Sequence, residues 1–206
     1  MLARIPGRVP LPVTASNQLK PLTLFTCLLN RHYVRPELKE SAAAIAVAMQ
    51  AAYPGTVVRY LDAGFPFING FPLFPHLSHN DGRKMDLSFC YTDTTGKPVN
   101  DAPALFGYGI CEEPRTNEVN TAMQCACKGY KQYSLLRQLY PQGKKQEYQF
   151  DSLRTRSLVT LCTGNPHIHK LFIEPHLKTR LQLRSDKIRF HGCQAVRHDD
   201  HIHIQL

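Results

Sequence analysis

The sequence predicts a mixed α+β domain in which helices flank a small antiparallel sheet. Two stretches, 85–91 and the C-terminal 201–206, alternate between polar and apolar residues, as half-buried strands do. Two others, 36–53 and 152–162, have the composition and end signals of helices. The chain has 206 residues, of which 43% are hydrophobic and 20% charged, and this suits one globular domain with a substantial core.

Residues 1–35 are expected to form a poorly defined N-terminal extension before a domain at 36–206. The apolar run 22–29 is about long enough for the core of a signal peptide, but no small-residue cleavage site follows it. A core segment, or a fragment of a longer amino-terminal region, is therefore the preferred interpretation. No run approaches the roughly 18 apolar residues of a membrane span, so none is expected.

The formal net charge of +9 comes from Lys and Arg residues scattered along the chain. A basic surface attracts anionic polymers in general, so charge alone does not separate a nucleic-acid partner from a cell-wall partner. No nucleic-acid motif is present, and we expect no nucleic-acid partner.

The first clear helix begins at Pro36, which suits the first turn, and Pro54 with Gly55 ends it. A strand rich in β-branched residues follows at 56–61. The next loop, 62–75, is rich in phenylalanine. These side chains either pack in the core, which we prefer, or wall a substrate groove: Phe65, Phe67, Phe71 and Phe74.

Residues 92–150 have the length and turn content of an insertion. Within it, 106–110 is expected to be short and extended, and a helix is expected from Gln124 to Leu139. Glu112 and Glu113 are adjacent, so on a strand they would face opposite sides and could not act as an acid pair.

Asp151 is predicted to cap a helix that Gly164 closes, with a role in a functional site as the alternative. A strand at 167–173 and a helix at 175–183 follow, and 187–190 leads towards a final hairpin. His167 and His169 lie in the predicted strand. They lack acidic neighbours, so ordinary hydrogen bonding is preferred to metal ligation.

The C-terminal strand presents two imidazoles on one face. His201 and His203 are two residues apart, so they point the same way and stand about 6.6 Å apart along the strand. Ile202, Ile204 and Leu206 point to the opposite face, into a core. This pattern favours a metal ligand and a second histidine beside a metal-bound water.

A second stretch supplies the remaining donors. Asp86 lies on the polar face of the strand at 85–91, and a turn at 80–82 folds His79 back towards it. With His203 these would be three ligands, leaving the fourth position for water, as in catalytic zinc sites. Arg83 and Lys84, next to Asp86, either bind a substrate carboxylate or are simply solvated.

Two motifs carry a resemblance to a known family. They are His-x2-His-x6-Asp, at His76, His79 and Asp86, and His-x2-His-x-His, which ends at His203 and includes two aspartates. Together they resemble the penicillin-insensitive murein endopeptidases of the lysostaphin, D-Ala-D-Ala metallopeptidase and hedgehog superfamily. Around Asp151 and Arg154 the similarity is looser, and the resemblance covers about 55–206.

The resemblance implies a hedgehog-like or D-Ala-D-Ala-peptidase-like fold and a zinc metallopeptidase that cuts peptidoglycan peptides. It implies one catalytic zinc, with a second ion possible at His76, which otherwise lines the cleft. His201 and His198 would be the catalytic histidines, and His198 can join only if the segment at Asp199 and Asp200 bends. One of those aspartates would fix an imidazole tautomer. The implied location is the bacterial envelope, periplasmic or secreted, although a clear signal peptide is lacking.

Two alternatives stay open. A D-Ala-D-Ala carboxypeptidase or dipeptidase typically has a glutamate shortly before the final His-x-His, and here Arg197 to Asp200 hold that place. A non-catalytic, zinc-stabilised domain that binds cell wall or protein has no use for His198 and His201.

The chain has 7 cysteines, which allow at most three disulfides with one left over. An envelope enzyme would use them in this way, and we expect some disulfides without assigning pairs. A second metal site around Cys125 and Cys127 is the alternative, but Cys-x-Cys has no matching pair downstream.

Overall fold

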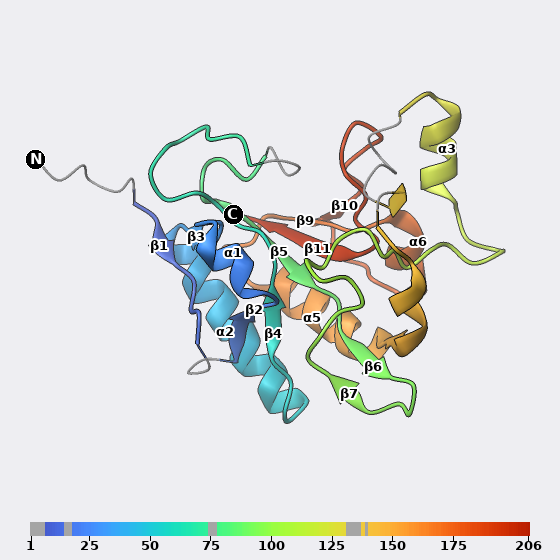
Figure 1. Ribbon diagram of the computed structural model, residues 1–206, viewed down its shortest axis with the longest axis horizontal. Helices are drawn as coiled ribbons and strands as arrows, with labels where there is room; N and C mark the ends of the chain where they lie inside the picture. The colour runs from blue at the N-terminus through green and yellow to red at the C-terminus, as the bar shows by residue number, and fades with distance from the viewer. Residues whose placement is uncertain (1–6, 15–17, 74–77, 131–136, 139) are drawn as a thin grey trace, which may run out of the picture.

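The computed structural model describes residues 7–14, 18–73, 78–130, 137–138 and 140–206. Its centre is a six-stranded sheet with the strand order β10-β9-β11-β5-β4-β2 (Figure 1). The strands are β2 (Leu19–Pro21), β4 (Val58–Tyr60), β5 (Lys84–Ser88), β9 (Lys170–Phe172), β10 (Ile188–Arg189) and β11 (His201–Gln205). The α+β class is therefore confirmed. The sheet is antiparallel through its centre, but the pairs β9-β10 and β2-β4 at its edges are parallel.

Two helices, α2 (Pro36–Ala52) and α5 (Ser152–Gly164), lie next to each other on one side of this sheet (Figure 1). They cover the apolar face of β5 and β11, where Met85, Leu87, Ile202 and Ile204 are at most 1% exposed. The predicted alternation is thus confirmed within β5 and β11. Because this face is filled by aliphatic side chains, the polar face carries Asp86, His201 and His203 on the opposite side.

The helix ends follow the sequence signals. Pro36 occupies the first turn of α2, and Asp151 caps α5 by accepting a hydrogen bond from the Arg154 N–H at 3.0 Å. The helix α6 (Pro175–Arg180) is shorter than predicted. It ends before Gln182, which adopts a φ of 53° that an α-helix cannot continue.

The described residues between 7 and 34 pack against the main sheet and its core. They form β1 (Val9–Pro10), β2, α1 (Leu24–Leu28) and β3 (Tyr33–Val34), and Leu11, Leu19 and Val34 are buried in the main core. The run 22–29 is not a buried segment as expected. Its apolar side chains are largely exposed at Leu24, Phe25, Leu28 and Leu29.

The predicted strand at 85–91 is divided in two. β5 ends at Ser88, and β6 (Tyr91–Asp93) joins β7 (Pro98–Val99) and β8 (Tyr148–Phe150) in a separate small sheet. A 3₁₀ helix, η2 (Gly143–Glu147), precedes β8. The expected insertion at 92–150 therefore contributes a second sheet beside the main one.

The helix predicted at 124–139 is wrong in its bounds. The helix α3 (Thr121–Cys127) begins three residues earlier because Asn120 caps it by accepting from the Met123 N–H at 2.9 Å. It ends at Cys127, and Gly129 follows with a φ of 85°. Residues 131–136 and 139 of the predicted helix lie outside the described residues.

Glu112 and Glu113 do not lie on a strand, and they contact different partners. Glu112 pairs with Lys145, whereas Glu113 pairs with Arg137 and Arg197.

None of the helices in the described ranges is long and apolar enough to cross a bilayer.

Candidate metal centre

His79, Asp86 and His203 meet on the polar face of the central sheet. His79 Nε2 lies 3.1 Å from His203 Nδ1 and 3.3 Å from Asp86 Oδ1, and His203 Nδ1 lies 2.9 Å from Asp86 Oδ1. The three residues are 1%, 0% and 3% exposed. They form a group of His, Cys, Asp or Glu side chains that can hold a metal ion.

This triangle has the size that a zinc ion requires. Donor atoms at about 2.0–2.1 Å from zinc, at the corners of a tetrahedron, lie about 3.3 Å from one another. The three edges of 2.9, 3.1 and 3.3 Å are close to this value. Two imidazoles and one carboxylate also form a donor set that zinc commonly uses, so the residues present fit the ion.

Strand register brings Asp86 and His203 together. In the antiparallel pair β5-β11, His203 lies opposite Asp86 and His201 lies opposite Ser88. Opposed residues share a face, so the Asp86 carboxylate and the His203 imidazole point to the same side. Asp86 and His203 belong to motifs that are far apart in the chain, yet they lie on neighbouring strands.

The turn that carries His79 is held at several points. The Arg83 N–H donates to Asp81 Oδ1 at 2.9 Å, and the Arg35 N–H donates to the Gly82 carbonyl at 2.8 Å. Gly82 has a φ of 73°, and Arg8, which is 4% exposed, donates to the Asn80 carbonyl at 2.8 Å. The turn predicted at 80–82 is confirmed, and the N-terminal segment helps to hold it.

His201 lies beside the triangle rather than within it. Its Nε2 is 3.8 Å from Asp86 Oδ1, and its Nδ1 is 2.5 Å from Asp200 Oδ1. Burial by itself would lower the pKa of His201, but the charges of Asp86 and Asp200 outweigh it and raise this pKa above its ordinary value. Asp200 therefore orients the ring and leaves Nε2 on the side of the triangle of His79, Asp86 and His203.

His198 also reaches the site because the backbone bends at 198–200, as its role required. Its ring centroid lies 4.8 Å from that of His201 and 5.8 Å from that of His203. Burial and the three neighbouring imidazoles lower its pKa well below the ordinary value. Its surroundings thus disfavour the protonated form of His198, which lies next to His201.

Only one of the two adjacent aspartates contacts a site histidine through a hydrogen bond in the described structure. Asp199 accepts hydrogen bonds from the Arg197 guanidinium, including one at 2.9 Å from Nε, and Arg197 also contacts Glu113. Asp200 instead pairs with His201.

Tyr108 is a site residue that the sequence did not indicate. Its hydroxyl donates to Asp86 Oδ2 at 2.8 Å, and its ring meets the His201 ring edge-on at a centroid distance of 4.9 Å. The segment 106–110 is not extended as expected, because Gly107 and Gly109 have φ values of 81° and 89°. Glycines on both sides of a tyrosine were the one available signal, and it is a weak one.

His191 is a second residue that sequence patterns did not reveal. Its ring stacks on Phe172 at 4.3 Å and lies 5.2 Å from the His198 ring. It also borders an open hollow of about 360 Å³, whose other lining residues are Lys128, Tyr130, Gly192, Cys193 and Gln194. His191 therefore lies between this hollow and the buried histidines.

A disulfide between Cys125 and Cys193 ties α3 to the loop that carries His191. Among the described residues, the other cysteines are free: Cys27, Cys90, Cys111, Cys127 and Cys162. The expectation of some disulfides is met by this one bond.

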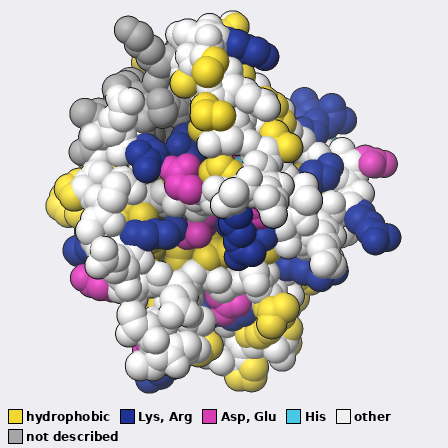
Figure 2. Space-filling view, turned by 90° about the vertical axis from the view of Figure 1, so that its right-hand side faces the viewer, with side chains coloured by type: hydrophobic (Ala, Val, Ile, Leu, Met, Phe, Trp, Pro, Cys, Tyr) yellow, Lys and Arg dark blue, Asp and Glu magenta, His cyan; other side chains and the backbone are white. Residues whose placement is uncertain are grey.

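The side of the molecule that bears α3 and α6 shows Lys and Arg side chains interspersed with Asp and Glu (Figure 2).

Several other candidates have different surroundings. His76 lies outside the described residues, as does Phe74. Arg83 donates to the Leu206 carbonyl at 3.2 Å, and Lys84 pairs with Asp81 at 2.8 Å. His167 and His169 are exposed.

Core packing, which was preferred for the phenylalanines of the loop at 62–75, is not what the structure shows: among its described phenylalanines none is buried. Phe65 and Phe71 stack on each other at 4.2 Å, while Phe67 is 59% exposed.

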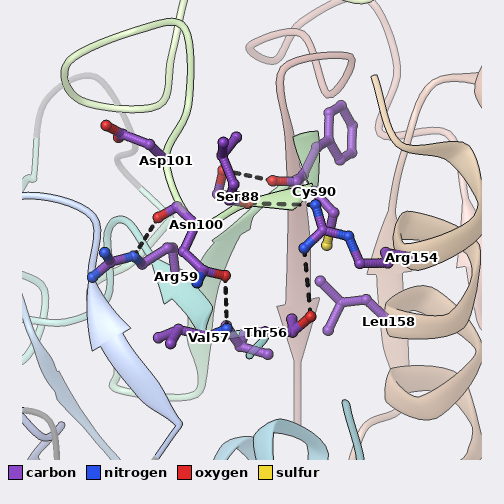
Figure 3. A pocket seen from close by; sticks show the side chains of 12 residues that line it. Thr56, Val57, Arg59, Ser88, Cys90, Asn100, Asp101, Arg154 and Leu158 are labelled. Carbon is purple, nitrogen blue, oxygen red and sulfur yellow. Dashed lines mark hydrogen bonds between the residues drawn. The ribbon is translucent and has the colours of Figure 1, made fainter. Parts of the chain in front are cut away.

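Asp151 and Arg154 act as a structural clamp. Arg154 donates to Asp151 Oδ2 at 2.6 Å and to the Tyr91 carbonyl. Its Nη1 lies 3.4 Å from Thr56 Oγ1 (Figure 3). The adjoining cavity of about 10 Å³ is too small for a substrate. Capping and clamping by this pair join α5 to the strands, away from the candidate metal site.

No model of a known protein family matches the sequence, and no curated protein matches it either.

Proposed function

We propose that this protein is a zinc-dependent peptidase that hydrolyses peptide cross-links or stem peptides of bacterial peptidoglycan. The observation that carries the proposal is the triangle of His79, Asp86 and His203, with edges of 2.9–3.3 Å. Next to this triangle lies His201, whose Nδ1 contacts the Asp200 carboxylate. Three donors on one side leave a coordination position for water. A purely structural zinc site would have a fourth protein ligand.

Bound zinc would supply Lewis acidity, lowering the pKa of a water and polarising the scissile carbonyl. His201 would accept the proton of the attacking water at Nε2, as the water oxygen bonds to the carbonyl carbon. It would then give this proton to the leaving amine as the C–N bond breaks. Asp200, at Nδ1, would stabilise the imidazolium between these two steps.

His198 has a different role in this proposal. Because its pKa is lowered, it stays uncharged near neutral pH, and a neutral imidazole can donate one hydrogen bond to the developing oxyanion. Burial of the histidines strengthens such interactions by excluding water.

The open hollow beside His191 would be the approach for the peptide, with Lys128 at its wall meeting a substrate carboxylate. Arg83 and Lys84 would bind a carboxylate only after leaving their present partners.

The bacterial envelope, either the periplasm or outside the cell, is the compartment that this activity requires. The Cys125–Cys193 disulfide supports it, because such bonds persist mainly in oxidising compartments.

The test combines metal analysis of the purified protein with a digest of isolated murein, separated by chromatography. We expect about one zinc per chain and the conversion of cross-linked muropeptides to monomers, with loss of both after chelation. Release of terminal D-alanine alone would instead identify a carboxypeptidase. Bound zinc without any cleavage, and no change with His201→Ala, would identify a non-catalytic binding domain and would refute the proposal.

A further inference from the structure

The two oxygens of Asp86 have separate surroundings. Oδ1 faces the imidazoles, at 2.9 Å from His203 Nδ1 and 3.3 Å from His79 Nε2. Oδ2 accepts the hydroxyl hydrogen of Tyr108 at 2.8 Å. The carboxylate is fully buried.

This division bears on how Asp86 would bind a metal. A carboxylate that uses both oxygens as ligands must turn Oδ2 towards the ion, and here that movement would break the hydrogen bond from Tyr108 at a buried position. Tyr108 thus favours coordination through Oδ1 alone. Single-oxygen coordination in turn keeps the fourth position of a tetrahedral site open for water.

The loop that holds Tyr108 is itself tied to the catalytic histidine. The N–H of the next residue, Gly109, donates to Asp200 Oδ2 at 2.5 Å, while Asp200 Oδ1 contacts His201 Nδ1. Gly107 approaches Leu61 so closely that a Cβ on it would lie 2.5 Å from the Leu61 side chain. Two successive residues of one loop, fixed by close packing, therefore contact the two carboxylates of the site.

We propose that Tyr108 is a positioning residue, which holds Asp86 as a single-oxygen metal ligand and, through Gly109 and Asp200, places His201 beside it. This proposal rests on the metal site of the proposed function but not on the identity of the substrate. A protein that binds zinc but leaves murein intact would refute the peptidase function and leave this inference standing.

The test is the variant Tyr108→Phe, which removes one oxygen and keeps the ring. Its zinc dissociation constant, measured by chelator competition, should rise about 10- to 100-fold, a typical effect for a residue that orients a metal ligand. The visible spectrum of the cobalt-substituted variant should also change, because the coordination of Asp86 changes. A merely structural role would alter thermal stability without moving that spectrum.

The matched control is Tyr60→Phe. Tyr60 is also fully buried and donates its hydroxyl hydrogen to the Pro12 carbonyl at 3.0 Å, outside the metal site. Its zinc affinity and cobalt spectrum should equal those of the wild type. An unchanged dissociation constant and spectrum in Tyr108→Phe would overturn the proposal.

A measurement on the wild type keeps the proposal testable if the variant does not fold. X-ray absorption of the zinc-loaded protein should fit four nitrogen or oxygen donors with one from Asp86. A fit that requires both oxygens of Asp86, or a wild-type protein that binds no zinc, would overturn it.

Discussion

His203 lies directly opposite Asp86 across the antiparallel pair β5-β11, with Nδ1 and Oδ1 2.9 Å apart. The two residues are 117 positions apart in the chain, and their cross-strand pairing sets one edge of the metal triangle. Both side chains are supported by aliphatic neighbours on the far face of the same strands, so the triangle is part of the packed sheet. Two of the three donors are thus placed by strand pairing, and the third, His79, comes from the turn before β5.

Replacement of the carboxylate tests the ligand set. Asp86→Ala removes one of three donors, and zinc occupancy after dialysis should fall from about one to near zero per chain. Plasma emission analysis of the dialysed protein measures this. Asp186→Ala, at an exposed position, should keep its zinc. Full zinc retention by Asp86→Ala would show that the ion is held by other residues.

Removal of the His201 imidazole separates catalysis from metal binding. His201→Ala should retain zinc, because His201 lies outside the triangle, and should cleave murein about 10²–10⁴-fold more slowly, the usual contribution of a general base. His169→Ala is the matched control, since His169 belongs to the exposed His-x-His pair. Equal rates in both variants would contradict the role of His201.

The stability of the metal-free protein should depend on pH. Burial lowers the pKa of His203 to about 4, against the partly compensating charge of Asp86, and the pKa of His198 is also lowered. In the unfolded chain both titrate near their ordinary value of about 6.5. Below that pH the unfolded state binds more protons, so stability falls as the pH drops from about 6.5 towards 4.

His201 acts with the opposite sign, because its pKa is raised in the fold. It stabilises the fold at low pH, and this contribution is lost as the pH rises through its folded pKa. The lowered pKa of His203 alone should reduce the free energy of unfolding by roughly 2 kcal/mol at pH 5 relative to pH 7.5. Urea unfolding in the presence of a chelator at the two pH values measures the difference. His203→Gln should have a weaker pH dependence than the wild type, and an equal or steeper one would contradict this account.

The Cys125–Cys193 disulfide should contribute to stability without holding the metal. The cysteines are 68 residues apart, and closing a loop of this length typically stabilises a fold by about 2–4 kcal/mol. Cys193→Ser should lower the free energy of unfolding by this amount and keep its zinc, because the ligands belong to β5, β11 and the turn before β5. Cys127→Ser, at an exposed free thiol, should match the wild type. Loss of zinc in Cys193→Ser would show that the loop supports the site.

Local and periodic features of the sequence determined a large part of this structure. The period of two in residues 201–206 placed His201 and His203 on one face and Ile202 and Ile204 on the other, since alternate residues of a strand face opposite sides. Pro36 and Asp151 marked helix starts because each suits a helix N-terminus for reasons that lie within a few residues. The spacing of His79 and Asp86 around a turn likewise needed no distant information.

Only the tertiary structure decided the residues that reach the site from elsewhere. Tyr108 contacts Asp86 from 22 positions away, and Gly109 contacts Asp200 from 91 positions away. His191, and the choice of Cys193 as the partner of Cys125, depend on how loops fold over the sheet. Such contacts have no sequence period, because loop packing is set by the shape of the assembled core rather than by the repeat of a helix or strand. The sequence by itself therefore determined the donors and the face that carries them, and the packed loops determined what holds those donors in place.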